Sequence, residues 1–211
     1  MRIISHRGYW RNSAEKNSII AFERSFDLGY GIETDIRDLN RTLVISHDMP
    51  SGDELTLKEL IKIMGGRNLP LALNIKSDGL VDQISRIIKE EKLSNSFVFD
   101  MSVPDQFSYI NDGNISVFTR MSEYEQNPAF YKECEGVWLD AFHGTWYNME
   151  LISNLLKDNK QVCIVSPELH KREDYKILWS ELRASGISKS DRVILCTDFP
   201  EDATRIFKED I

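Results

Sequence analysis

The chain has 211 residues, of which 41% are hydrophobic and 28% are charged. This composition is typical of an ordinary globular chain of one or at most two domains, and it excludes a mainly disordered protein. No run approaches the roughly 18 consecutive apolar residues of a membrane span, and the first residues lack the apolar stretch of a secretory signal. We therefore expect a cytoplasmic protein.

The net charge restricts the ligands that the protein would attract, and the number of cysteines restricts its disulfide bonding. The 26 basic and 34 acidic residues give a formal net charge of −8, which argues against nonspecific attraction to nucleic acid or to an anionic membrane. An anionic ligand would therefore need a local basic site. Cys134, Cys163 and Cys196 are odd in number and widely spaced, so we expect reduced thiols in or near the core.

Short apolar runs rich in β-branched residues alternate regularly with longer segments of helical spacing. Eight strands are predicted, at Arg2–His6, Gly31–Ile36, Leu71–Ile75, Phe97–Asp100, Ile115–Thr119, Gly136–Asp140, Val162–Val165 and Val193–Thr197. A helical segment is expected after each strand. The clearest are Ser18–Leu28 and Val81–Lys92, whose apolar residues recur three and four positions apart. Thr56, with Glu59 three residues later, predicts a helix that begins with a capping box.

Strand–helix alternation implies a parallel sheet, because parallel strands need a crossover long enough to hold a helix. An open doubly wound sheet usually needs five or six strands, so eight units favour an α/β fold of the (β/α)8 TIM-barrel class. One extra extended run, Leu43–His47, follows the second strand after a possible turn at residues 40–42. We interpret it as an elaboration of that loop with only a short cap behind it, in a single domain over residues 1–211.

Two carboxylates lie two positions apart in the second predicted strand. Glu33 and Asp35 therefore point to the same side of the sheet. Two like charges on a buried face need compensation, and a hard divalent cation such as Mg2+ or Ca2+ supplies it through oxygen ligands. The alternatives are a solvated edge, or ion pairs with the nearby arginines Arg2, Arg7 and Arg37.

Two histidines close early extended runs, where barrel enzymes carry their chemistry. His6 ends the first predicted strand and His47 ends the extra run. Their unperturbed pKa near 6.5 suits a general acid and base pair. Arg7 and Lys76 would add fixed positive charge suited to phosphate oxygens. Structural histidines and ion pairs with nearby acidic residues are the alternatives.

Several motifs, taken in chain order, resemble the glycerophosphodiester phosphodiesterases. That family opens with His-Arg-Gly, then has Glu-Asn-Thr before an Ala-Phe helix, then Glu-x-Asp and His-Asp. The matching residues are His6-Arg7-Gly8, Asn17-Ser18 with Ala21-Phe22, Glu33-Thr34-Asp35 and His47-Asp48. Weaker matches are Thr56-Leu57 with Glu59-Leu60, Lys76, and Thr197-Asp198-Phe199-Pro200. The resemblance spans the chain but is dense only as far as Lys76.

The resemblance implies a (β/α)8 barrel that cleaves a glycerophosphodiester with the help of Mg2+ or Ca2+. By position, His6 and His47 would be the catalytic acid and base. Arg7, with Lys76, would bind the substrate phosphate, and a matching carboxylate pair, Glu33 and Asp35, would hold the metal. The attacking group in such enzymes is commonly a hydroxyl of the substrate's own glycerol, giving a cyclic phosphate that water then opens.

The third predicted strand departs from the family pattern. Asn74 stands where the family has a glutamate that binds the metal; its amide oxygen is a weaker ligand. Glu168 would supply the missing carboxylate from across the barrel mouth. The family's usual ending of the seventh strand is also missing, so the aromatic residues Trp138, Trp146 and Tyr147 would either line the substrate pocket or pack the loops.

The sequence therefore predicts a metal-dependent hydrolase of a small-molecule phosphodiester, with no nucleic-acid partner and no membrane span. One alternative is an enzyme of the sphingomyelinase D type acting on phospholipid headgroups, which the lack of an export signal disfavours. The other is a non-catalytic phosphodiester-binding barrel, which Asn74 would permit but the retained histidines and carboxylates disfavour. The alcohol groups of the substrate, the preferred cation and the oligomeric state stay open.

Overall fold

The computed structural model describes residues 1–208, and its strands form one sheet that closes on itself. The strands are β1 (Arg2–His6), β2 (Gly31–Leu39), β3 (Thr42–Ile45), β4 (Leu71–Ile75), β5 (Ser96–Phe99), β6 (Ser116–Met121), β7 (Gly136–Leu139), β8 (Gln161–Val165) and β9 (Val193–Thr197). β1 pairs in parallel with both β2 and β9, which closes the ring β1-β2-β4-β5-β6-β7-β8-β9. The predicted (β/α)8 barrel is confirmed.

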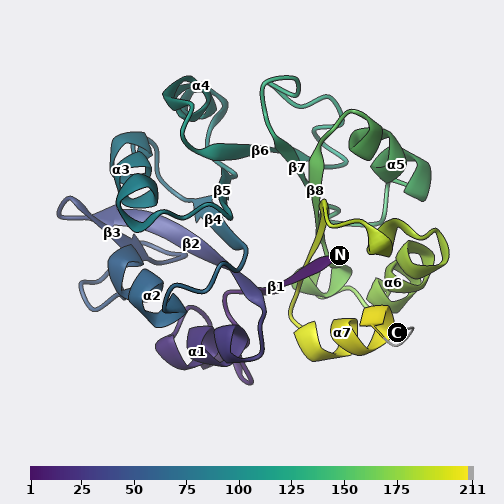
Figure 1. The fold of residues 1–211 in the computed structure, drawn as a ribbon, viewed down its shortest axis with the longest axis horizontal. Helices are drawn as coiled ribbons and strands as arrows, with labels where there is room; N and C mark the ends of the chain where they lie inside the picture. Colours follow the sequence, from purple (N-terminus) through teal and green to yellow (C-terminus); the bar gives the residue numbers. More distant parts are fainter. Residues whose placement is uncertain (209–211) are drawn as a thin grey trace.

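The helices of residues 1–208 surround this ring of strands (Figure 1). They are α1 (Ile19–Asp27), α2 (Leu57–Met64), α3 (Val81–Glu91), α4 (Val103–Asp112), α5 (Met149–Lys157), α6 (Tyr175–Ala184) and α7 (Pro200–Lys208), with single 3-10 turns η1 (Ser13–Glu15), η2 (Pro167–His170) and η3 (Ile187–Lys189). The predicted helices after the first and third barrel strands are confirmed as α1 and α3. The capping box of Thr56 and Glu59 begins α2.

The expectation of a helix after every strand is wrong after β6. The connection from β6 to β7, residues 122–135, contains only turns and irregular structure. It carries Pro128 and a mostly polar sequence without an apolar stripe at helical spacing. Among the described residues of this connection, Phe130 and Cys134 pack into one core cluster and Tyr131 packs against another. An amphipathic helix is therefore not available to cover the barrel at this point.

The extra extended run forms β3, which pairs antiparallel with the far end of β2 outside the barrel ring. Asn40 and Arg41 make the two-residue turn between Leu39 and Thr42, and both have positive φ, 49° and 65°. Positive φ at both central residues is the geometry of a type I′ hairpin, which suits the twist of the strands. The hairpin brings the chain back to the mouth of the barrel just before His47.

Apolar side chains form an inner cluster within the barrel and two outer clusters between strands and helices. The inner cluster holds Ile4, Ala72, Phe97, Phe99, Phe118, Trp138, Cys163, Val165, Ile194 and Cys196. One outer cluster packs α1 to α4 against the strands and the other packs α5 to α7. All three cysteines are free and buried, as predicted. Within the described chain, no helix is long and apolar enough to cross a membrane.

Candidate active site at the barrel mouth

Strand alternation places polar side chains directly above the inner apolar cluster. Two residues beyond Ile4 in β1 comes His6, and two beyond Ala72 in β4 comes Asn74. The same step from Cys196 in β9 gives Asp198. Alternate residues of a strand share one face, so these side chains meet at the C-terminal end of the barrel. We call His6, Arg7, Glu33, Asp35, Asn74, Lys76 and Asp198 the β1 half of the mouth.

His6 is held by an aspartate from the last strand of the barrel. Its Nδ1 lies 2.9 Å from Asp198 Oδ1, and its Nε2 lies 4.0 Å from Glu33 Oε2. The indole N–H of Trp10 donates to the His6 carbonyl oxygen at 3.1 Å. The side chain of His6 is 14% exposed. Asp198 thereby fixes the ring so that Nε2 faces the carboxylates of β2. Asp198 belongs to the closing Thr-Asp-x-Pro motif, to which the sequence alone assigned no role.

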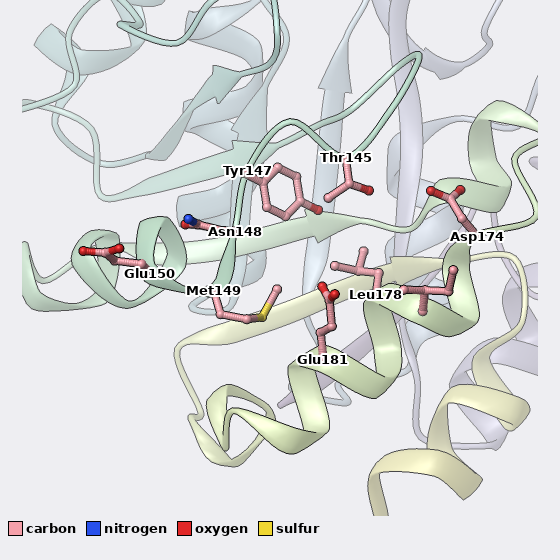
Figure 2. A pocket seen from close by; sticks show the side chains of 9 residues that line it. Thr145, Tyr147, Asn148, Met149, Glu150, Asp174, Leu178 and Glu181 are labelled. Carbon is pink, nitrogen blue, oxygen red and sulfur yellow. The ribbon is translucent and has the colours of Figure 1, made fainter.

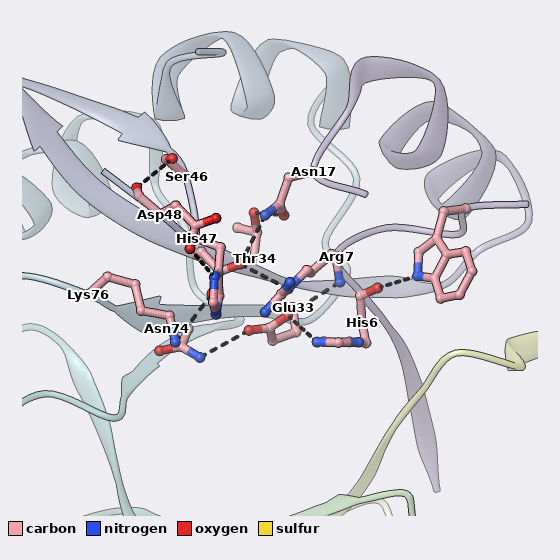
Figure 3. A network of polar contacts seen from close by, with 12 residues as sticks. His6, Arg7, Asn17, Glu33, Thr34, Ser46, His47, Asp48, Asn74 and Lys76 are labelled. Atoms are coloured by element: carbon pink, nitrogen blue, oxygen red, sulfur yellow. Dashed lines mark hydrogen bonds and ion pairs between the residues drawn. The ribbon is translucent and has the colours of Figure 1, made fainter. Parts of the chain in front are cut away.

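Glu33 lies beside His6 and is almost completely buried, with 2% exposure. It accepts hydrogen bonds from the Arg7 backbone N–H and from Asn74 Nδ2, each at 3.3 Å (Figure 3). Burial raises the pKa of the Glu33 carboxyl, and the nearby charge of Asp35 raises it further. Glu33 is therefore a carboxylate whose negative charge is not fully compensated by its protein partners.

Asp35 is fully buried and is surrounded by donors. Arg7 Nε lies 3.0 Å from one carboxylate oxygen and Lys76 Nζ lies 3.4 Å from the other. Asn17 Nδ2 donates to Asp35 at 2.9 Å. Of the ion pairs weighed from the sequence, the one with Arg7 is therefore observed. Arg2 instead donates to Asn95 and Gln161.

The conformation of the His-Arg-Gly segment explains how Arg7 reaches Asp35. Arg7 has a φ of 58° and Gly8 a φ of 79°, so the chain turns sharply after β1. A Cβ atom at Gly8 would lie 2.8 Å from the Cβ of Ala21 in α1, which leaves no room for a side chain. The turn is tied down by the Arg7 N–H, which donates to the Glu33 carbonyl oxygen at 2.9 Å. Glycine is thus required for α1 to pack this close to the site.

Some oxygen atoms of this network match the kind of ligand that a hard divalent cation prefers. Among residues 1–208, no group of three or more His, Cys, Asp or Glu side chains is arranged to hold a metal ion. Within the part of the chain that the structure describes, Asn74 Oδ1 is buried without a hydrogen-bond partner, and Asp35 Oδ1 has only the Lys76 contact. These two oxygens and the Glu33 carboxylate fit the oxygen preference of Mg2+ or Ca2+. A candidate ligand set at this place would consist of two carboxylates and one amide.

Glu168 lies on η2, after β8, and is engaged by other groups. Its carboxylate accepts hydrogen bonds from the hydroxyls of Ser166 and Thr197, and from the Asp198 backbone N–H at 3.2 Å. The indole N–H of Trp179 donates to Ser166 at 2.9 Å. Burial raises the pKa of Glu168 despite these donors. None of its contacts within the described residues is with the carboxylates of β2, so its role as a metal ligand stays a prediction.

His47 occupies a more open position than His6. Its side chain is 47% exposed, and its Nδ1 lies 2.9 Å from the exposed carboxylate of Asp48. His47 and Arg7 line the same open groove of about 940 Å3, between the β1–α1 loop and the segment that leads into α2. The tertiary fold therefore brings His47 to the side of Arg7, which the two residues' separation in sequence does not reveal.

Four further polar residues, at or beyond the ends of the other strands, were not predicted from the sequence as site residues. Asp100 follows β5, Arg120 lies near the end of β6, Asp140 follows β7, and His170 lies on η2 after β8. Arg120 and Asp140 come two residues after the inner-cluster residues Phe118 and Trp138. That alternation was the signal that could have found them. We call Asp100, Arg120, Asp140 and His170 the β7 half of the mouth.

A separate pocket of about 620 Å3 lies outside the barrel, between α5 and α6 (Figure 2). Its lining comes from the β7–α5 loop, which contributes the buried Tyr147, from the start of α5 and from α6. Trp146 donates its indole N–H to the Asp140 carbonyl oxygen at 2.7 Å, and both aromatics pack in the outer core cluster. Of the three aromatics considered for the substrate pocket, only Trp138 lies inside the barrel.

Solved structures share this architecture over the whole chain, although no protein-family model and no curated protein matches the sequence. A glycerophosphodiester phosphodiesterase from Agrobacterium tumefaciens has a TM-score of 0.71 at 13% identity, over 99% of both chains. One from Parabacteroides distasonis has 0.68 at 17% identity, over 100% of this chain and 87% of its own. The chain has the fold of the glycerophosphodiester phosphodiesterases.

A further match shows the limit of this likeness. A phosphodiesterase from Oleispira antarctica, solved with the product sn-glycerol-3-phosphate, has a TM-score of 0.67 at 14% identity, over 99% of this chain and 97% of its own. Tryptophan synthase from Pyrococcus furiosus, a different enzyme, still reaches 0.52 at 14% identity. The barrel alone does not determine the chemistry, which has to be argued from the site.

Proposed function

We propose that the protein is a divalent-cation-dependent hydrolase of phosphodiesters, acting on a glycerophosphodiester or a related alcohol-phosphate diester. The observation that carries the proposal is the arrangement around His6. An Asp198-oriented imidazole lies 4.0 Å from the buried carboxylate of Glu33, and the second buried carboxylate of β2, Asp35, contacts Arg7 and Lys76. The shared fold with enzymes of this activity supports the same conclusion.

Arg7 and Lys76 are the groups proposed to bind the substrate phosphate. Arg7 contacts Asp35 through Nε, and none of its hydrogen bonds within the described chain uses Nη1 or Nη2. Those two nitrogens remain free for phosphate oxygens, for which the guanidinium fork is well suited. Asp35 therefore positions both cations rather than neutralising them completely.

His6 and His47 are proposed to move the protons. During cleavage a hydroxyl oxygen forms a bond to phosphorus while the bond from phosphorus to the leaving alcohol oxygen breaks. One histidine accepts the proton of the attacking hydroxyl, and the other donates a proton to the departing alkoxide. Asp198 holds His6 in one orientation throughout, as expected of a group that orients a catalytic imidazole.

The oxygens of Glu33, Asp35 and Asn74 would hold the divalent cation. When bound, such a cation supplies positive charge that stabilises the negative charge developing on the phosphoryl oxygens. Asn74 Nδ2 donates to Glu33, so its own Oδ1 is turned away from that bond and stays available. With an amide in place of a third carboxylate, we expect binding of the cation to be weaker than at a fully anionic site.

The proposal is tested with metal-stripped protein assayed on glycerophosphodiesters after addition of Mg2+, Ca2+ or Mn2+. We expect activity only with a cation, and we expect His6→Ala to lower kcat by about 100-fold or more. His143→Ala, a change of an exposed histidine on the β7–α5 loop, is the matched control and should leave kcat unchanged.

Activity that survives both chelation of the metal and His6→Ala would refute the assignment. Binding of the diester without any turnover, measured by calorimetry, would instead identify a phosphodiester-binding barrel. Release of a cyclic phosphate from a lysophospholipid would indicate the headgroup enzyme of the sphingomyelinase D type.

A further inference from the structure

The β7 half of the mouth carries a second set of polar side chains that the proposed reaction does not use. Arg120 and Asp140 lie above the aromatic part of the inner cluster, following Phe118 and Trp138 in alternation. Trp138 stacks on Phe99 with ring centroids 3.8 Å apart. The polar groups therefore stand on a rigid, closely packed floor.

Asp140 and His170 form a fixed pair on this floor. His170 Nε2 lies 2.6 Å from Asp140 Oδ1, which also accepts the Ala141 backbone N–H at 2.8 Å. The side chain of Asp140 is 8% exposed and that of His170 is 25% exposed. Among the described residues, neither His170 Nδ1 nor Asp140 Oδ2 has a hydrogen-bond partner. The pair thus presents one ring nitrogen and one carboxylate oxygen that are held in place and unused.

Arg120 is held in a similar way by two carboxylates. Its Nη1 donates to Asp100 Oδ1 at 2.7 Å and its Nε donates to Glu125 Oε2 at 2.6 Å. Within residues 1–208, Arg120 Nη2 and Asp100 Oδ2 make no further hydrogen bond. Two carboxylates share the single positive charge of Arg120, so the group keeps one net negative charge and offers oriented donors and acceptors.

An aromatic edge adjoins the pair. The Phe142 ring lies 4.8 Å from the His170 ring, and Tyr124 lies 6.2 Å from Phe142 between ring centroids. Tyr124 is 69% exposed. Glu123 accepts the backbone N–H groups of Phe142 and His143 and so fixes this edge.

The one-turn helix η2 links the two halves of the mouth. It carries His170 and also Glu168, which accepts the Asp198 backbone N–H. Asp198 in turn holds His6. Asp140 and His170 are therefore linked through η2 to the same hydrogen-bonded frame as the proposed catalytic histidine.

We propose that Arg120, Asp140 and His170 bind a cyclic polyol, a sugar or cyclitol ring, that forms one of the two alcohol groups of the diester. The inference rests on the proposed function and names the substrate class. Each ring hydroxyl both donates and accepts a hydrogen bond, and fixed donors alternate with fixed acceptors here. The aromatic edge of Phe142 and Tyr124 suits the apolar face of the ring.

Other alcohols fit this half less well. An acyl chain would leave the buried polar atoms of Asp140 and His170 unsatisfied, which is costly. A quaternary ammonium group such as choline offers no hydrogen bonds to these groups. The carboxylates whose negative charge would attract it are held by hydrogen bonds to Arg120 and His170, which a quaternary ammonium group cannot replace.

The test compares two diesters that share a glycerophosphate and differ in the second alcohol, glycerophosphoinositol and glycerophosphocholine. We expect kcat/KM to be at least about 10-fold higher for the inositol diester. His170→Ala and Arg120→Gln should each lower kcat/KM for the inositol diester by about 10- to 100-fold, since each removes a hydrogen bond that involves a charged or fixed group. Activity on the choline diester should change by less than about 3-fold.

Arg86→Gln, a change of an exposed arginine on α3 outside both halves of the mouth, serves as the control. His170→Gln, which keeps the size of the side chain, replaces His170→Ala if the alanine variant is unstable to heat. Equal losses on both diesters, or a preference for choline, would overturn the subsite while leaving the phosphodiesterase assignment intact.

Binding separates failure of the subsite from failure of the proposed function. If neither diester is cleaved, calorimetry with inositol 1-phosphate is compared between the wild type and His170→Ala. Weaker binding by the variant would support the subsite although the enzyme assignment fails. Unchanged binding, or no binding to the wild type, would overturn it.

Discussion

The two halves of the barrel mouth are built differently from the same strand ends. In the β1 half, polar residues come in adjacent or alternate positions, such as His6 with Arg7 and Glu33 with Asp35, and buried charges crowd together. In the β7 half, single residues at or beyond the ends of neighbouring strands pair with each other, such as Asp140 after β7 with His170 after β8. The β1 half concentrates buried charge suited to a phosphate, and the β7 half spreads oriented hydrogen-bonding groups suited to hydroxyls.

The largest expected effects are losses of activity when the aspartate that holds each histidine is changed to asparagine. Asp198→Asn weakens the orientation of His6, so we expect kcat to fall by about 100-fold on every diester. Asp140→Asn disturbs His170, so we expect a loss of about 10-fold in kcat/KM that is confined to diesters of cyclic polyols. Steady-state kinetics on the inositol and choline diesters measure both. Losses that follow the same pattern for the two variants would remove the functional distinction between the halves.

The dependence of stability on pH should have opposite signs for Glu33 in the β1 half and for Glu123, which holds the aromatic edge beside the β7 half. Burial raises the pKa of Glu33 in the folded protein. Its contribution to stability is therefore full below the unfolded-state pKa of about 4.3 and is lost as pH rises through the higher folded-state pKa. Burial would also raise the pKa of Glu123, but hydrogen bonds from the His143 and Phe142 N–H groups lower it overall. Its contribution is present above about 4.3 and is lost as pH falls.

Urea unfolding of metal-free protein at a series of pH values measures these signs. The free energy of unfolding of Glu33→Gln, relative to the wild type, should increase as pH rises from about 4.3. That of Glu123→Gln should approach the wild-type value as pH falls below the same point. A divalent cation at Glu33 would reduce the first effect, because it favours the ionised carboxylate. If the free energy of unfolding of both variants, relative to the wild type, changed with pH in the same direction, the assignment of Glu33 as a destabilised carboxylate would be contradicted.

The smallest effects concern the helix caps behind each half. Thr56 begins α2 and exchanges hydrogen bonds reciprocally with Glu59, whereas Ser102 begins α4 by accepting only the Asp105 N–H. We expect Thr56→Ala and Ser102→Ala each to lower the free energy of unfolding by about 1 kcal/mol. Thr56→Ala should be the larger. Unfolding in urea measures the change, and kcat should be unaffected in both; a fall in kcat would show that the cap also positions the mouth.

Most of the β1 half could be predicted from the sequence, because its residues follow one another closely along the chain. His6 with Arg7, and Glu33 with Asp35, share strands whose alternation fixes their direction. The pairing of His6 with Asp198 joins the first strand to the last, and it needs the ring to close. The compensation of Asp35 by Arg7 required the positive φ of Arg7, which no local propensity favours.

The β7 half could not be predicted in the same way. Asp100, Arg120, Asp140 and His170 are isolated residues in unremarkable local sequences. Only the register of neighbouring strands, in which Arg120 stands opposite Trp138, places them on one floor. The prediction of a helix after β6 is wrong, because the strand–helix repeat seen elsewhere in the chain was extended to a segment that has no apolar stripe at helical spacing.

The sequence by itself determined the eight strands, most of the helices and the mouth on which a site would lie, because periodicity and capping are local properties of the chain. The tertiary structure decided which side chains meet. Closure of the ring brought Asp198 to His6, left Asn74 Oδ1 without a partner and tied both halves to η2. Contacts between residues far apart in the chain depend on barrel closure and strand register, and neither is encoded in any single segment.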